Sequence, residues 1–161
     1  VKGSSCRTSL AGEVAAIRVA YAPPTRRTIG LRYASVRPAR ISQRRWEMAA
    51  HAAAAHALDR VCYPKDGMWS AAQFEEEIRS PRTAALGAWT VGDSGDEALV
   101  GMCFTSTVLD EASLTSLAVH PRLRRRGIGE ALVCESMARA QAAGAARFLL
   151  EVRLGNEAAL R

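Results

Sequence analysis

Residues 114–130 read LTSLAVHPRLRRRGIGE, and this stretch decides the fold. An apolar strand leads into a loop with three successive arginines, Arg124, Arg125 and Arg126, and two glycines then open a helix. The N–H groups at a helix start are unpaired and carry partial positive charge. Glycines let an anion approach the main chain closely. The stretch therefore predicts a cradle for a phosphate or pyrophosphate group.

The glycine spacing alone is a weak signal. It lacks the Gly-Lys-Ser/Thr end of a P-loop, and only Gly127 and Gly129 of a three-glycine dinucleotide fingerprint are present. The alternative is an ordinary helix start with a solvated arginine cluster. The glycines by themselves leave both interpretations open.

Outward from this stretch, periodicity and turn residues predict an α/β arrangement with a mixed sheet. Ser70 is expected to cap a helix and Gly144 to end one. Val133, Met137 and Ala140 form an apolar stripe at helical spacing. We expect strands at 31–36, 84–91, 98–108, 113–119 and 148–152, and helices at 42–60, 70–79 and 127–143, with another helix beginning at Asn156.

The positive charge of the chain is concentrated at its N-terminal end. Residues 1–45 contain ten Lys or Arg residues and one acidic residue, whereas residues 46–161 contain twelve basic and fifteen acidic residues. We therefore expect residues 1–29 to be a basic leader, either a transit peptide or a disordered tail, and the folded domain to span 30–161. The leader favours a plastid location; without it the protein is expected in the cytoplasm.

Several classes of protein lose support from the composition. Because residues 46–161 carry more acidic than basic groups, direct nucleic-acid binding is not expected. No apolar run approaches the roughly 18 residues of a membrane span. The four cysteines are far apart and have no histidine at ligand spacing, so neither a metal site nor a disulfide framework is expected; we expect Cys103 and Cys134 to be packed core residues.

The context of the glycines strengthens the anion-site interpretation. Arg124-x-x-Gly127-x-Gly129 resembles the acetyl-CoA signature of the GNAT superfamily, and it follows a Leu-Ala-Val-x-Pro strand end as in that family. Further segments resemble the RimI-type ribosomal-protein alanine N-acetyltransferases: Trp69-Ser70 with Phe74, the VLDEA turn at 108–112, and LEVR at 150–153 with Asn156. The Gly-Met-Trp-Ser segment at 67–70 is similar to cyanobacterial and plastid members. The resemblance covers roughly residues 31–161.

This resemblance implies a GNAT fold, a mostly antiparallel mixed sheet flanked by helices and splayed between the strands at 113–119 and 148–152. It also implies acetyl-CoA as cosubstrate. The pantetheine would pair with the strand before the loop, the pyrophosphate would lie on the loop and helix start, and Asn156 would contact the cofactor. The residues implied for the pantetheine are Leu117, Ala118 and Val119, and those for the pyrophosphate are Arg124, Arg125, Arg126, Gly127, Ile128, Gly129 and Glu130.

Glu151 is the general base that the resemblance implies. It would take a proton from the attacking amine, and partial burial in an apolar strand would raise its pKa toward the useful range. The alternative is a strand-end carboxylate paired with Arg153 or Arg147. The amide of Val119 could polarise the thioester carbonyl.

Three functions follow from the resemblance. The first is acetylation of a protein N-terminal α-amine, on a ribosomal protein as in the RimI type; the second is acetylation of a lysine side chain or a small amine; the third is CoA binding without turnover. The family carries a general-acid Tyr on the helix that follows Asn156, and this sequence stops before it, at Arg161. We therefore expect the domain to be incomplete at its C-terminus, which puts activity of this polypeptide in doubt and leaves a sheet edge unpaired.

Overall fold

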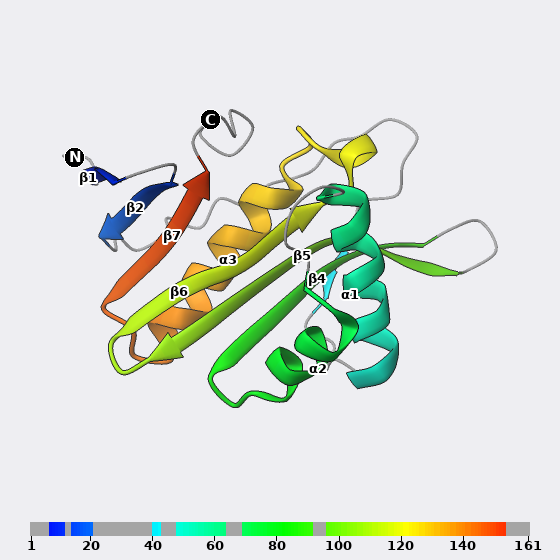
Figure 1. Ribbon diagram of the computed structural model, residues 1–161, viewed down its shortest axis with the longest axis horizontal. Helices are drawn as coiled ribbons and strands as arrows, with labels where there is room; N and C mark the ends of the chain where they lie inside the picture. The colour runs from blue at the N-terminus through cyan, green and yellow to red at the C-terminus, as the bar shows by residue number, and fades with distance from the viewer. Residues whose placement is uncertain are drawn as a thin grey trace.

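One mixed sheet carries helices on both faces (Figure 1). The computed structural model describes residues 7–11, 14–20, 40–42, 48–63, 69–91 and 96–153. These residues form a seven-stranded sheet in the order β1-β2-β7-β6-β5-β4-β3. The strands are β1 Arg7–Ala11, β2 Val14–Ala20, β3 Arg40–Ser42, β4 Thr83–Val91, β5 Glu97–Val108, β6 Glu111–Val119 and β7 Arg147–Arg153; the helices are α1 Met48–Cys62, α2 Ala71–Arg79 and α3 Ile128–Ala142, with a short 3-10 turn at Pro121–Leu123.

The central elements confirm the sequence-based expectations. β4, β5 and β6 form an antiparallel meander, whereas β6 and β7 are parallel, so the sheet is mixed. Ser70 caps α2 through a capping box with Gln73. Gly144 adopts a positive φ of 95° after α3, a conformation that favours glycine. The first helix begins at Met48 rather than at residue 42, and the strand expected at 31–36 lies outside the described residues.

The N-terminal strands lie against β7. β1 pairs with β2, and β2 pairs antiparallel with β7 from Val14 opposite Arg153 to Ala20 opposite Arg147. The edge of β7 expected to be unpaired is therefore covered by β2. That expectation is wrong for this structure because it considered only the strands of the resemblance, and β2 lies in the segment assigned to the leader. A transit-peptide role for residues 1–29 stays a prediction.

β6 and β7 pair over only a short length. Their register runs from Glu111 opposite Arg147 to Leu114 opposite Leu150 and stops there. At the same point the pairing of β6 with β5 shifts register, because Thr115 is skipped between Leu114 and Ser116. The rest of β6 diverges from β7 (Figure 1). The splay expected between these strands is confirmed.

Two core clusters lie on opposite faces of the sheet. On the face covered by α1 and α2, the rings of Trp69, Phe74 and Phe104 lie within 5.2–6.2 Å of one another. On the other face, the N-terminal half of α3 packs Ile128 and Leu132 against β4 and β5. This separation leaves the C-terminal end of β6 between α1 on one face and the start of α3 on the other (Figure 1).

The buried stripe of α3 differs from the expected one. The buried residues are Ile128, Leu132, Ser136 and Ala140, whereas Val133 and Met137 are partly exposed. A search for apolar residues overlooks Ser136 because it is polar. Its hydroxyl forms a hydrogen bond in the core with the Thr105 hydroxyl of β5, and this bond offsets the free-energy cost of burying a polar group.

Gly101 allows α3 to lie close to β5, and substitution by alanine tests this packing. A Cβ there would lie 2.9 Å from Cγ2 of Ile128 and 3.1 Å from Cδ1 of Leu132. We expect Gly101→Ala to lower the free energy of unfolding by about 1–3 kcal/mol through overpacking, measured by urea denaturation. Gly129→Ala is the control, because its Cβ would meet Val119 at an ordinary 3.6 Å. Equal stability of the two variants would contradict the close approach.

Candidate functional site

The segment that the sequence predicts to form an anion cradle follows the end of β6. The loop after Val119 makes the 3-10 turn, whose N-cap His120 accepts a hydrogen bond from the Arg122 N–H at 3.3 Å. Gly127 then takes a left-handed conformation, with φ 76°, and α3 starts at Ile128 with no side-chain cap. The first N–H groups of α3 therefore have no partner within the helix and no capping side chain. Gly127 serves here because residues with a Cβ rarely adopt this backbone conformation.

The arginines add charge at this helix start. Arg124 donates from Nε to the Val119 carbonyl at 3.0 Å, which ties the loop to the end of the strand. Arg125 has a positive φ of 62° and is exposed, as are Arg122 and Arg124. Positive φ is uncommon in a residue with a side chain, and such outliers cluster at functional sites. The structure thus brings together the loop arginines, Gly127 and the start of α3.

Near this loop, the main-chain N–H and C=O groups of β6 point alternately toward β5 and away from it. The His120 N–H donates to the Val100 carbonyl at 2.9 Å, which makes this a hydrogen-bonded pair of the β5–β6 ladder. In an antiparallel ladder, polar main-chain groups alternate between the partner strand and the other side. Ala118 therefore points its groups toward β5, whereas Leu117 and Val119 point theirs toward the β7 side. On that side no register pair follows Leu114 among the residues that the structure describes. Of the three residues implied for the pantetheine, these two present main-chain groups to the gap.

Side chains from the end of α1 reach these outward carbonyls. The Tyr63 hydroxyl donates to the Leu117 carbonyl at 2.7 Å. The Cys62 thiol donates to the Val119 carbonyl, with an S···O distance of 3.4 Å. Burial raises the pKa of the Cys62 thiol, and the nearby Arg124 partly opposes this shift. The end of α1 and the loop arginine therefore converge on one short stretch of β6.

The same end of α1 also holds the main chain of Trp69. His56 donates from Nδ1 to the Trp69 carbonyl at 2.8 Å, and the Asp59 carboxylate accepts from the Trp69 N–H. Asp59 is 6% exposed, and burial raises its pKa, while the Trp69 hydrogen bond and His56 oppose the rise. The sequence analysis missed this cluster. Its signal is the spacing of three and four residues from His56 through Asp59 to Cys62 and Tyr63, which places them on one helix face.

Glu151 lies on β7, opposite Ala16 of β2, and its side chain is exposed. Phe148 and Leu150 pack with α3, so the alternation of the strand turns Glu151 to the opposite face, where α1 lies. The partial burial expected for Glu151 is therefore absent. Asn156 lies outside the described residues.

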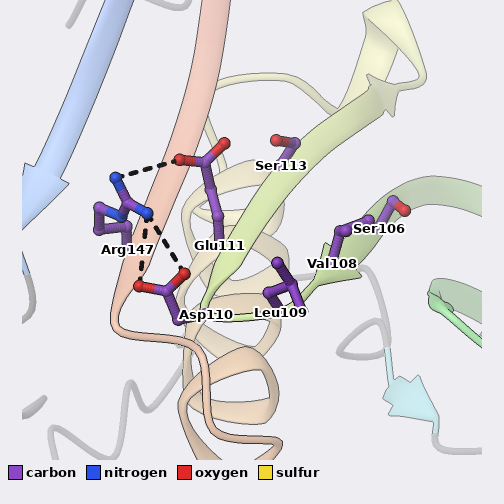
Figure 2. A pocket seen from close by; sticks show the side chains of 7 residues that line it. All are labelled: Ser106, Val108, Leu109, Asp110, Glu111, Ser113 and Arg147. Atoms are coloured by element: carbon purple, nitrogen blue, oxygen red, sulfur yellow. Dashed lines mark hydrogen bonds and ion pairs between the residues drawn. The ribbon is translucent and has the colours of Figure 1, made fainter.

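Arg147, one of the two partners considered for Glu151, is engaged elsewhere. Its guanidinium contacts both Asp110 oxygens at 3.2 and 3.3 Å and Glu111 at 3.7 Å (Figure 2). These residues line a pocket beside the β5–β6 turn, at the end of β6 away from the anion cradle. The ion pairs hold the first residues of β7 against the turn that starts β6.

Other expectations concern metals, membranes and cysteines. Within the part of the chain that the structure describes, no group of three or more His, Cys, Asp or Glu residues could hold a metal ion. None of the described helices is long and apolar enough to cross a membrane. Cys103 is buried as expected, but Cys134 is exposed on α3, because it lies outside the buried stripe of that helix.

The family model of the GNAT acetyltransferases matches residues 47–161. The chain belongs to this family. Curated GNAT relatives include two ribosomal protein bS18-alanine N-acetyltransferases. The enzyme of Salmonella typhimurium is 36% identical over 67 residues, which are 42% of this chain and 45% of that protein; the enzyme of Escherichia coli is 39% identical over 62 residues, 38% and 42% of the two chains. The matched region thus spans less than half the length of these relatives.

Solved GNAT structures are similar to this one. The crystal structure of the ribosomal-protein alanine N-acetyltransferase from Escherichia coli superposes with a TM-score of 0.58 and 27% identity, covering 69% of this chain and 66% of that chain. An aminoglycoside 6'-N-acetyltransferase complexed with coenzyme A superposes with a TM-score of 0.53 and 24% identity, covering 65% and 57%. At that identity the second similarity shows the fold alone.

The buried carboxyl of Asp59 gives a pH-dependent prediction. Burial raises its pKa above the ordinary 3.8, so its contribution to stability is present below that pH and is lost as the pH rises through the folded-state pKa. Asp59→Asn keeps an acceptor for the Trp69 N–H and does not ionise. We expect the stability of Asp59→Asn relative to wild type to increase from pH 4 to pH 7 in urea denaturation. Glu76→Gln, at an exposed carboxyl of α2, should show no such trend; a relative stability of Asp59→Asn that falls with pH would contradict the assignment.

Proposed function

We propose that this chain is the acetyl-CoA-binding and catalytic part of an N-acetyltransferase. The observation that carries the proposal is the continuity of two anchoring features. The outward main-chain groups of Leu117 and Val119 lead within a few residues to Gly127 and the uncapped start of α3. A molecule with an amide-containing arm and a pyrophosphate fits such a surface, because the strand edge pairs with amides and the helix start binds phosphate.

Each part of the site has a proposed share of cofactor binding. Leu117 and Val119 would pair with the pantetheine, with Ala118 packed between them. The loop and the first turn of α3 would hold the pyrophosphate through main-chain N–H groups, with added charge from the arginines. Membership of the GNAT acetyltransferase family supports acetyl-CoA as the donor. The residues proposed for the pyrophosphate are Arg124, Arg125, Arg126, Gly127, Ile128, Gly129 and Glu130.

The proposed reaction is direct transfer to an amine. The amine nitrogen attacks the thioester carbonyl, the new C–N bond forms, and the C–S bond breaks with its electron pair moving to sulfur. Glu151 takes the proton that the amine loses, and its exposure on the α1 face keeps it reachable by an incoming amine. The Val119 N–H stabilises the developing oxyanion.

The acceptor that the relatives favour is a protein N-terminal α-amine. Both curated relatives are named as alanine N-acetyltransferases of ribosomal protein bS18, and they are 36% and 39% identical to this chain over the matched residues. A ribosomal-protein N-terminus is therefore the proposed partner. A peptide that starts with alanine and a lysine-containing peptide with a blocked N-terminus distinguish this acceptor from a side-chain amine.

The cofactor site is tested by placing a negative charge at the proposed pyrophosphate site. We expect Gly127→Glu to weaken acetyl-CoA binding by at least about 10-fold in calorimetry, because the carboxylate replaces the phosphate and repels it. Gly144→Glu is a matched control: it adds the same charge at a glycine that also has a positive φ, 95°, but at the other end of α3. Loss of binding in both variants, or in neither, would contradict the assigned position of the site.

The base is tested by removing its charge. We expect Glu151→Gln to lower kcat for a peptide beginning with alanine by about 10²–10⁴-fold, while the dissociation constant for acetyl-CoA stays within a factor of about two. Thiol release measures the rate. Glu135→Gln, which removes a carboxylate paired with Arg139 on α3, should leave the rate unchanged. A Glu151→Gln variant as active as wild type would exclude Glu151 as the base.

A further inference from the structure

Tyr63 occupies the part of β6 that the proposed cofactor needs. Its hydroxyl donates to the Leu117 carbonyl at 2.7 Å, across 54 residues of sequence. Leu117 is one of the two residues whose main-chain groups point away from β5 and toward the gap beside β7. The tyrosine side chain therefore takes the place of a strand partner at this carbonyl.

The surrounding donors show the same arrangement. The Val119 carbonyl, the next outward acceptor along β6, is bonded by the Cys62 thiol and by Arg124 Nε. Side chains thus supply to these carbonyls the donors that a partner strand would supply elsewhere. Tyr63 is 39% exposed, which leaves its side chain room to move outward.

We infer that Tyr63 is a positioning residue whose hydroxyl holds the Leu117 carbonyl in the free protein and is displaced when acetyl-CoA binds. The inference rests on the proposed function. A strand-like partner would donate to the outward Leu117 carbonyl, and the phenol already donates to that carbonyl at 2.7 Å. The pantetheine amide then replaces the phenol as donor, and no covalent bond changes.

Displacement of Tyr63 also affects the end of α1. The Tyr63 N–H donates to the Asp59 carbonyl at 2.8 Å in the last turn of the helix, and Asp59 in turn holds the Trp69 main chain. The Tyr63 phenol, bonded to β6, and the Asp59 carboxylate, bonded to the Trp69 main chain, thus connect the end of α1 to two separate segments. Release of the phenol removes the contact between Tyr63 and the strand and leaves the contact with Trp69 in place.

The test compares Tyr63→Phe with wild type in the full chain of 161 residues. Phenylalanine keeps the ring and removes only the competing hydroxyl. We expect calorimetry to show acetyl-CoA and CoA binding about three- to tenfold more tightly, the value of one hydrogen bond that no longer has to be broken. A purely structural role predicts the opposite sign, because a loosened site binds its ligand more weakly.

Thr83→Val is the matched control. Its hydroxyl also makes a 2.7 Å hydrogen bond, to the Glu77 carboxylate, but it joins β4 to α2 away from β6. This variant should lose a comparable hydrogen bond and bind CoA as wild type does. A Tyr63→Phe protein that binds CoA equally or more weakly than wild type overturns the inference and leaves the proposed function standing. If folded wild-type protein binds no CoA, the proposed function itself fails, and the inference fails with it.

A second measurement uses wild-type protein and does not depend on the folding of a variant. We expect hydrogen exchange at the Tyr63 amide, in the last turn of α1, to become faster when CoA saturates the protein, because the side chain that anchors this turn to β6 has been displaced. Unchanged or slower exchange there, with CoA bound, overturns the inference.

Discussion

The structure depends on the point at which β6 stops pairing with β7. Up to Leu114 the two strands share a parallel register, and from Thr115 onward β5 is the only strand paired with β6 among the described residues. The register shift at Thr115 changes the local twist of β6, as an extra residue in one strand of an antiparallel pair does. The end of a central strand therefore presents main-chain donors and acceptors to a gap inside the sheet. The side chains of Tyr63, Cys62 and Arg124 donate hydrogen bonds to these main-chain acceptors.

Helix α1 reaches the gap because it can lie close to the sheet. Ala52 and Ala55 are fully buried against the sheet cluster, and such small side chains permit a short distance between helix and strand. The last turn of α1 then extends Cys62 and Tyr63 over β6. On the opposite face, Ile128 and Leu132 of α3 pack around Gly101 of β5. Gly101 is the register partner of Val119 on the neighbouring strand β6. Packing on the two faces therefore fixes both the donors and the anion cradle relative to one strand.

Local signals in the sequence were sufficient for much of this fold. The capping residue Ser70, the turns around β5 and the glycines at 127 and 144 mark the central strands and two helices without reference to the rest of the chain. β2 pairs with β7 across more than a hundred residues of sequence, and a local sequence pattern does not predict such long-range pairing. The hydrogen bonds of Cys62 and Tyr63 span 57 and 54 residues, and a tyrosine next to a proline reads only as a turn. Ser136 was overlooked because its burial depends on the hydroxyl of Thr105.

The distribution of charge along β6 matters more for ligand binding than the net charge of the domain. Residues 46–161 carry more acidic than basic groups, which on average disfavours an anionic ligand. At the start of β6, however, Asp110 and Glu111 are paired with Arg147 (Figure 2). Just after the end of β6, four arginines lie between residues 122 and 126. Three of these four are exposed beside the positive end of the α3 dipole. The strand therefore separates acidic from basic groups, an arrangement that would attract a polyanionic cofactor to the proposed site at the end of β6. The same placement makes a net negative domain compatible with the proposed phosphate-binding site.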